Sequence, residues 1–204
     1  MKHFLSIAFL ILLLSTCFAQ KKWIWSEEDR KYLLENLKKT KDSVIKETKG
    51  LSKAQWNFKE SPDRWSINQI VEHLAIWELL LQREITFGFT GGERPELIDS
   101  ARSDSAVVAF LMEESPHIAT EYTKPFSYTV PMGINDGANN LAWFLRMRDE
   151  SIGFVDTTSS NLRIYFLRPK RNSVHQVFIT IFAHNDRHLR QIRRVKMDAR
   201  YPKK

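Results

Sequence analysis

Apolar residues recur three and four positions apart in four long stretches of this chain, and polar residues fill most positions between them. This spacing places the apolar residues on one face of an amphipathic helix. It predicts an all-α protein whose long helices cover residues 26–49, 66–87, 138–156 and 173–197. We expect the apolar faces to form the core of a helix bundle.

The predicted helix starts carry side chains that can bond the free amide groups of a first turn. Ser66 is followed by Gln69, and Ser173 by Gln176, which is the spacing of a capping box. Ser26 is also a favourable N-cap, because acidic residues follow it in the first turn. These signals fix the starts of three helices more firmly than their ends.

The connections between these helices contain most of the residues that interrupt regular structure. Residues 90–131 contain four prolines. Within that segment we predict a shorter helix over residues 103–114 and a loop or edge strand over residues 126–130. Residues 51–64 and 157–172 are predicted as connections, and the second of these is polar and rich in turn residues.

The first nineteen residues have the features of a secretory signal peptide. Lys2 gives a positive start, an apolar run covers residues 4–14, and small residues precede the expected cut after Ala19. The run is shorter than the roughly 20 apolar residues that a membrane span needs. We therefore expect an exported mature domain over residues 20–204, without a transmembrane span.

Cys17 is the only cysteine of the chain. The residues before it approach a lipobox, so a lipoprotein anchored through Cys17 is the alternative to simple cleavage, although Thr16 is unfavourable directly before a lipidated cysteine. After cleavage behind Ala19 the mature chain has neither a disulfide nor a thiol nucleophile.

The chain has 204 residues and a formal net charge of +7, which is enough length for one domain with a real core. Basic proteins often bind nucleic acid or anionic membranes. Here, however, lysines and arginines are mixed with acids along the whole chain. A stripe of Arg187, Arg190 and Arg194 on the last helix is interpreted as solvated surface, so no nucleic-acid partner is expected.

Three histidines lie at helix positions where they can act together. His184 and His188 stand one turn apart on an otherwise apolar face of the last helix, and His73 faces inward on the second. Two such imidazoles can bind one ion, and a third from a neighbouring helix leaves a fourth position open, as in catalytic zinc sites. Zinc and nickel both suit imidazole ligands. The alternative is that the three histidines simply fill the core.

Other chemistries fit this sequence less well. Asn185 occupies the position where zinc peptidases carry their general base, and Glu84 is only a marginal candidate for a carboxylate ligand. The sequence has no G-x-S-x-G motif, no phosphate-binding glycine loop and no cysteine cluster. Gln191, one turn past His188, is expected to orient a ligand, to support a histidine or to be only an amide of the core.

The chain resembles the DinB-like (DinB/YfiT) superfamily in two segments, Trp65-Ser66-Ile67-x-x-Ile70-x-x-His73-Leu74 and His184-x-x-Arg187-His188-x-x-Gln191-Ile192. The resemblance spans about residues 26–196. It implies an up-down-down-up four-helix bundle with a long connection between the second and third main helices. It also implies a divalent metal, zinc or nickel, held by His73, His184 and His188.

Relatives of this kind include thiol-dependent S-transferases, a thiol-dependent isomerase and proteins described only as metal-dependent hydrolases. In a transferase the metal would bind the thiolate of a cosubstrate, and in a hydrolase it would activate water. Export to the bacterial periplasm makes a reduced thiol harder to supply. The sequence therefore favours a hydrolase acting on a small-molecule substrate. A thiol S-transferase and a binding module without turnover stay open as alternatives, as does a homodimer.

Overall fold

A computed structural model describes residues 25–113, 129–167 and 172–203. The predicted signal peptide and the lipidation alternative at Cys17 lie outside these residues, as does most of the predicted loop or edge strand over 126–130. Within the described part of the chain, no helix combines the length and apolar character that a membrane crossing requires.

Four long helices form the body of the protein. They are α2 (Glu27–Thr48), α4 (Ile67–Thr90), α7 (Gly137–Thr157) and α8 (Val174–Met197). Each follows an N-cap whose side chain accepts a hydrogen bond from the backbone N–H three residues later; the caps are Ser26, Ser66, Asp136 and Ser173. All three serines form capping boxes. The four predicted helices are thereby confirmed to within one turn at each end.

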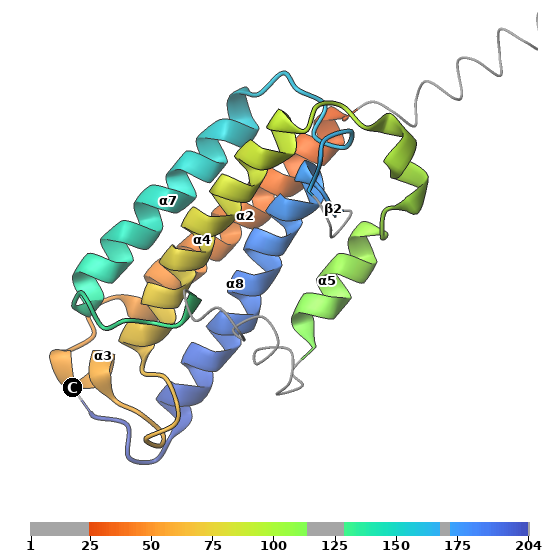
Figure 1. The fold of residues 1–204 in the computed structure, drawn as a ribbon. Coiled ribbons are helices and arrows are strands. Elements are labelled where there is room, and N and C mark those ends of the chain that lie inside the picture. The colour runs from red at the N-terminus through yellow and green to blue at the C-terminus, as the bar shows by residue number, and fades with distance from the viewer. Residues whose placement is uncertain (1–24, 114–128, 168–171, 204) are drawn as a thin grey trace, which may run out of the picture.

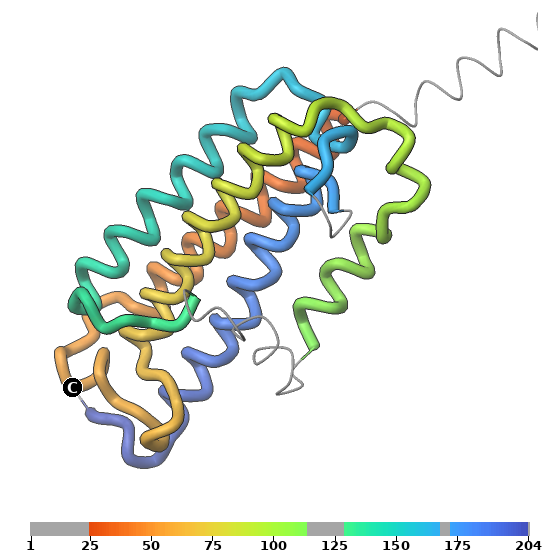
Figure 2. The backbone as a smooth tube through the Cα atoms, in the orientation of Figure 1, coloured from red at the N-terminus to blue at the C-terminus, as the bar shows by residue number. Residues whose placement is uncertain are grey.

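The helices α2 and α8 run in one direction, and α4 and α7 run in the other (Figure 1). Taken in chain order, this is the up-down-down-up arrangement that the resemblance implied. α4 packs against α7 and α8, and α2 packs against the same two helices. In Figure 2, α4 ends at one end of the bundle and α7 begins at the other end. The connection between them must therefore run along the whole bundle, which is why it is long.

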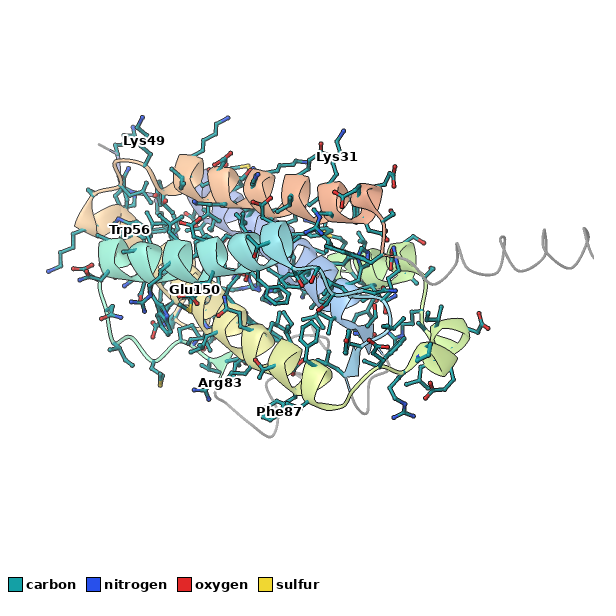
Figure 3. All side chains as sticks on the ribbon, turned by 90° about the horizontal axis from the view of Figure 1, so that it is seen from above. Lys31, Lys49, Trp56, Arg83, Phe87 and Glu150 are labelled. Carbon is teal, nitrogen blue, oxygen red and sulfur yellow. The ribbon has the colours of Figure 1, made fainter. Side chains whose placement is uncertain are left out.

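Side chains fill the space between the helices, whereas charged residues such as Lys31 and Lys49 point away from it (Figure 3). The apolar core consists of two clusters, one centred on residues such as Leu33 and Phe178 and the other on residues such as Phe144 and Ile192. All four of these side chains are at most 1% exposed. The core therefore extends along the whole bundle.

One short helix and two short strands occur where the sequence predicted only connections. The helix α3 (Lys53–Asn57) begins at its own capping box, formed by Ser52 and Gln55. The strands β1 (Phe166–Leu167) and β2 (Asn172–Ser173) pair in an antiparallel way directly before α8. These elements correct the predicted connections without changing the all-α class of the body.

The connection between α4 and α7 contains a 3-10 helix, η1 (Pro95–Ser100), and the helix α5 (Asp104–Met112), which confirms the short helix predicted there. α5 packs against α8 on the outside of the bundle.

This packing corrects the interpretation of the arginine stripe on α8. Arg194 is exposed, but Arg187 and Arg190 are half-buried. Arg187 donates a hydrogen bond to the carbonyl of Glu113, and Arg190 donates one to the carbonyl of Met112. Carbonyl groups at a helix end lack partners within the helix, and cations are favoured there. The two arginines therefore hold the C-terminal end of α5 instead of facing only solvent.

Candidate metal centre

Two helices bring the three predicted histidines to one point. His73 lies in the second turn of α4, and His184 and His188 lie one turn apart on α8. His73 is 3% exposed and His188 is 8% exposed, while His184 is half-buried. One nitrogen from each ring lies within 4.8 Å of the other two. Among the described residues, no second group of this kind is found.

The three rings lie close together, with centroids 4.5, 4.7 and 5.1 Å apart. Nε2 of His184 is 3.3 Å from Nε2 of His73 and 3.1 Å from Nε2 of His188. The same nitrogen of all three rings therefore points to one common centre, which is the arrangement that three ligands of one ion require.

Hydrogen bonds on the far side of two rings determine which nitrogen carries the proton. Nδ1 of His73 is 2.5 Å from the carbonyl oxygen of Thr129, and Nδ1 of His188 is 2.8 Å from the amide oxygen of Gln191. Both oxygens accept, so Nδ1 must donate in each ring. The Nε2 of each ring is then left with a lone pair facing the centre, as in metal-ligating histidines with an outer hydrogen bond. Gln191 thus supports a histidine.

This convergence is unfavourable without a positive charge at the centre. His73 and His188 each present a lone pair there, and a proton on His184 Nε2 can be donated to only one of them. Burial holds the pKa of His73 and of His184 well below its usual value, and a protonated His188 and the guanidinium of Arg187 lower both further. Burial also lowers the pKa of His188 to about 4. All three rings are neutral at pH 7, which is the form that binds metal.

Two tryptophans flank the three histidines. The ring of Trp65 is 4.8 Å from that of His73 and lies roughly parallel to that of His188 at 6.4 Å. The ring of Trp77 is 4.8 Å from that of His184. Both tryptophans are half-buried, so each has one part in the core and one part accessible beside the site. The surroundings of the centre are therefore largely aromatic.

Two groups that were not predicted from the sequence are the carbonyl of Thr129, which is bonded to His73, and the carboxylate of Glu72, the residue before His73 in the chain. Glu72 is 1% exposed and accepts hydrogen bonds from the backbone N–H groups of Met132 and Gly133. The position of Glu72 beside His73 was visible in the sequence. Its partners were not, because they lie some sixty residues away and use only backbone atoms.

Other residues considered from the sequence do not join the site. Glu84 is half-buried and does not belong to the histidine group. Asn185 is buried at 1% exposure, and no general base stands at its position. A further buried histidine, His175, is occupied elsewhere: its Nδ1 accepts from Trp25, and its Nε2 lies 3.3 Å from a carboxylate oxygen of Asp104.

The chain is similar to a known protein family and to a solved structure. A family model described as the DinB superfamily matches residues 36–192. One similar solved structure is that of YfiT from Bacillus subtilis, described as "a probable metal-dependent hydrolase with an unusual four-helix bundle topology". The two chains are 12% identical over 84% of this chain and 88% of that chain, with a TM-score of 0.48. No curated protein matches.

Proposed function

The chain belongs to the DinB superfamily, and from that premise we propose that it is a metal-dependent hydrolase of small molecules. The observation that carries the proposal is the convergence of three neutral imidazole nitrogens, with Nε2 separations of 3.1 and 3.3 Å about His184. We propose His73, His184 and His188 as the ligands of one divalent cation. Zinc and nickel are the proposed ions, because both suit imidazole.

A cation held in this way would supply Lewis acidity and activate water at neutral pH. The chain's own residues determine the remaining features of the site. The carbonyl of Thr129 and the amide of Gln191 hold two of the rings with Nε2 facing inward. Three protein ligands would leave at least one position of such an ion open for water or a substrate.

The character of the substrate follows from the groups that surround the centre. Trp65 and Trp77 present aromatic surface on two sides. Within the described residues, no carboxylate or hydroxyl group is bonded to the three rings. We therefore propose a substrate with an apolar or aromatic group beside the bond that is hydrolysed. The same shortage of acid–base groups favours the alternative of a metal-binding module without turnover.

The place of action is proposed from the first nineteen residues, which have the features of an export signal. We propose that the mature domain acts in the periplasm, with anchoring through a lipidated Cys17 as the alternative. The N-terminal residue and the mass of the exported protein distinguish the two: cleavage after Ala19 leaves Gln20 first, whereas a lipoprotein begins at a modified Cys17.

The test of the proposed function measures bound metal first and turnover second. Purified protein is incubated with zinc or nickel, and its metal content is compared with that of His73→Ala and of His175→Asn. The control changes another buried histidine and keeps an acceptor for Trp25. We expect about one ion per chain in the parent and the control, and none in His73→Ala. No bound metal in the parent would overturn the proposal.

Turnover is then screened with the metal-loaded protein and aryl esters and amides. Hydrolysis that disappears in His73→Ala but not in His175→Asn supports a hydrolase. Stoichiometric metal with bound but unconverted ester would replace the hydrolase with the binding module. Conversion only when a low-molecular-weight thiol is added would identify an S-transferase.

A further inference from the structure

Two neighbouring side chains of α4 hold the loop that precedes α7. Nδ1 of His73 donates to the carbonyl of Thr129 at 2.5 Å. Glu72 accepts from the N–H of Met132 at 2.9 Å and from the N–H of Gly133 at 3.0 and 3.1 Å. The loop from Thr129 to Gly133 is therefore bonded at one end to a proposed metal ligand and at the other end to the residue beside that ligand.

The carboxylate of Glu72 is buried at 1% exposure. A buried carboxylate is unfavourable unless it is hydrogen-bonded, and bonds from N–H groups to an ionised acceptor are stronger than neutral ones. Two consecutive backbone N–H groups that point at one anion form a concave anion site. Gly133 makes this turn with φ 71°, a conformation that side-chain-bearing residues rarely adopt.

Near Gly133, packing of side chains does little to hold the loop against α4. The side chains of Met132 and Ile134 are 65% and 66% exposed, so apolar burial does not anchor them. The next hydrogen bond to α4 comes from Asn68, which donates to the carbonyl of Asn135 at 3.3 Å. The Glu72 bonds thus lie between this contact and the Thr129 carbonyl, where they determine the path of the chain toward His73.

We propose that Glu72 is a positioning residue of the metal centre. It holds the Met132–Gly133 backbone, the backbone holds the Thr129 carbonyl, and that carbonyl keeps the proton of His73 on Nδ1. Nε2 of His73 then faces the centre as a lone pair. This inference rests on the proposed function for its metal, but its geometric step concerns the metal-free chain.

The first readout is zinc affinity, measured by competition with a chromophoric chelator. Removal of a partner that orients a ligand typically weakens metal binding by roughly 10- to 100-fold. We expect a loss of this size in Glu72→Ala and a smaller loss in Glu72→Gln, whose amide keeps only one acceptor oxygen. The control is Glu84→Gln, about three turns along the same helix, which should bind zinc as the parent does.

The second readout is the tautomer of His73 in the metal-free protein, obtained from nitrogen–proton correlation spectra of the imidazole rings at pH 7.5 and assigned with His73→Gln. The parent should show His73 protonated on Nδ1. Glu72→Ala should show a mixture of the two tautomers. A general loss of stability would not change this ratio while the bundle stays folded.

The inference is overturned if either readout in Glu72→Ala equals that of the parent. If Glu72→Ala does not fold, Glu72→Gln decides by the same two criteria. If the parent itself binds no zinc, the proposed function fails, and the tautomer of metal-free His73 still decides whether Glu72 positions it.

Discussion

Arg148 and Glu78 form a two-pronged ion pair in the centre of the bundle, with side chains that are 0% and 3% exposed. Nε and Nη2 of Arg148 donate to the two carboxylate oxygens at 2.8 and 2.9 Å. Nη1 donates to the hydroxyl of Thr40 and to the carbonyl of Leu37 on α2. One guanidinium group therefore connects α7 to both α4 and α2.

The first prediction concerns this pair. Glu78→Ala should lower the free energy of unfolding by about 3–5 kcal/mol, because it leaves the guanidinium buried without its counter-charge. The double variant Glu78→Leu, Arg148→Met should lose less than the sum of the two single variants. Urea denaturation at pH 7.5 measures the parent, Glu78→Ala, the double variant and its two single variants, Glu78→Leu and Arg148→Met. A loss below about 1 kcal/mol in Glu78→Ala would contradict the importance of the pair.

The second prediction compares two glycines of α7. A Cβ at Gly137 would lie 2.2 Å from the ring of Trp56, whereas a Cβ at Gly153 meets no atom within 4 Å. Gly137→Ala should destabilise the protein by about 1–3 kcal/mol through overpacking. Gly153→Ala should stabilise it by up to about 1 kcal/mol, because alanine is the better helix residue. Thermal unfolding of the two variants should give shifts of opposite sign. A stabilising shift in Gly137→Ala would show that Trp56 moves away from the added methyl group, and a destabilising shift in Gly153→Ala would contradict the second half of the prediction.

The third prediction concerns pH and the metal-free protein. The pKa of His188 is about 4 in the folded chain against an ordinary value of 6.5, because the ring is buried. The unfolded chain therefore binds the proton first, and the contribution to stability is full above pH 6.5 and is lost as the pH falls toward 4. The expected loss is on the order of 3 kcal/mol.

Urea denaturation in the presence of a chelator at pH 7.5 and pH 4.5 measures this loss. His188→Gln should show a smaller pH dependence than the parent, since the His188 ring is gone while His73, His184 and the carboxylates still titrate. The same difference between the two pH values in both proteins would contradict the prediction.

The fourth prediction concerns stabilisation by metal. Free zinc at about 100 times its dissociation constant should raise the free energy of unfolding by about 2.7 kcal/mol, because the ion binds the folded chain. Thermal unfolding with and without zinc measures the effect, which excess chelator should reverse. His184→Ala removes one of the three proposed ligands and should show no zinc-dependent shift. An equal shift in that variant would place the zinc elsewhere.

Much of this architecture could be predicted because its signals are local. A capping box marks a helix start within four residues of sequence, as Ser66 with Gln69 and Ser173 with Gln176 do. The spacing of His184 and His188 places them on one helix face whatever the rest of the chain does. The helix α3 has the same capping-box signal at Ser52, but its five residues are too short to show apolar periodicity.

The parts of the site that could not be predicted depend on contacts that sequence spacing does not encode. Thr129 reaches His73 through its backbone carbonyl, a group that every residue has. The arginine stripe of α8 follows the expected helical spacing, yet Arg187 and Arg190 end at α5, and that packing depends on the path of a long connection. A local pattern identifies the helix face on which a residue lies, but it does not identify the segment that covers that face.

The parallel course of α4 and α7 has a consequence for insertions and deletions. A helix of 24 residues is about 36 Å long, and an extended chain covers that distance with about eleven residues. The stretch between Thr90 and Gly137 is several times longer than this minimum. A shortened connection would still allow the bundle to close. It would be too short to bring the carbonyl of Thr129 to His73. The fold would survive such a deletion, and the proposed metal centre would lose the carbonyl that is bonded to His73.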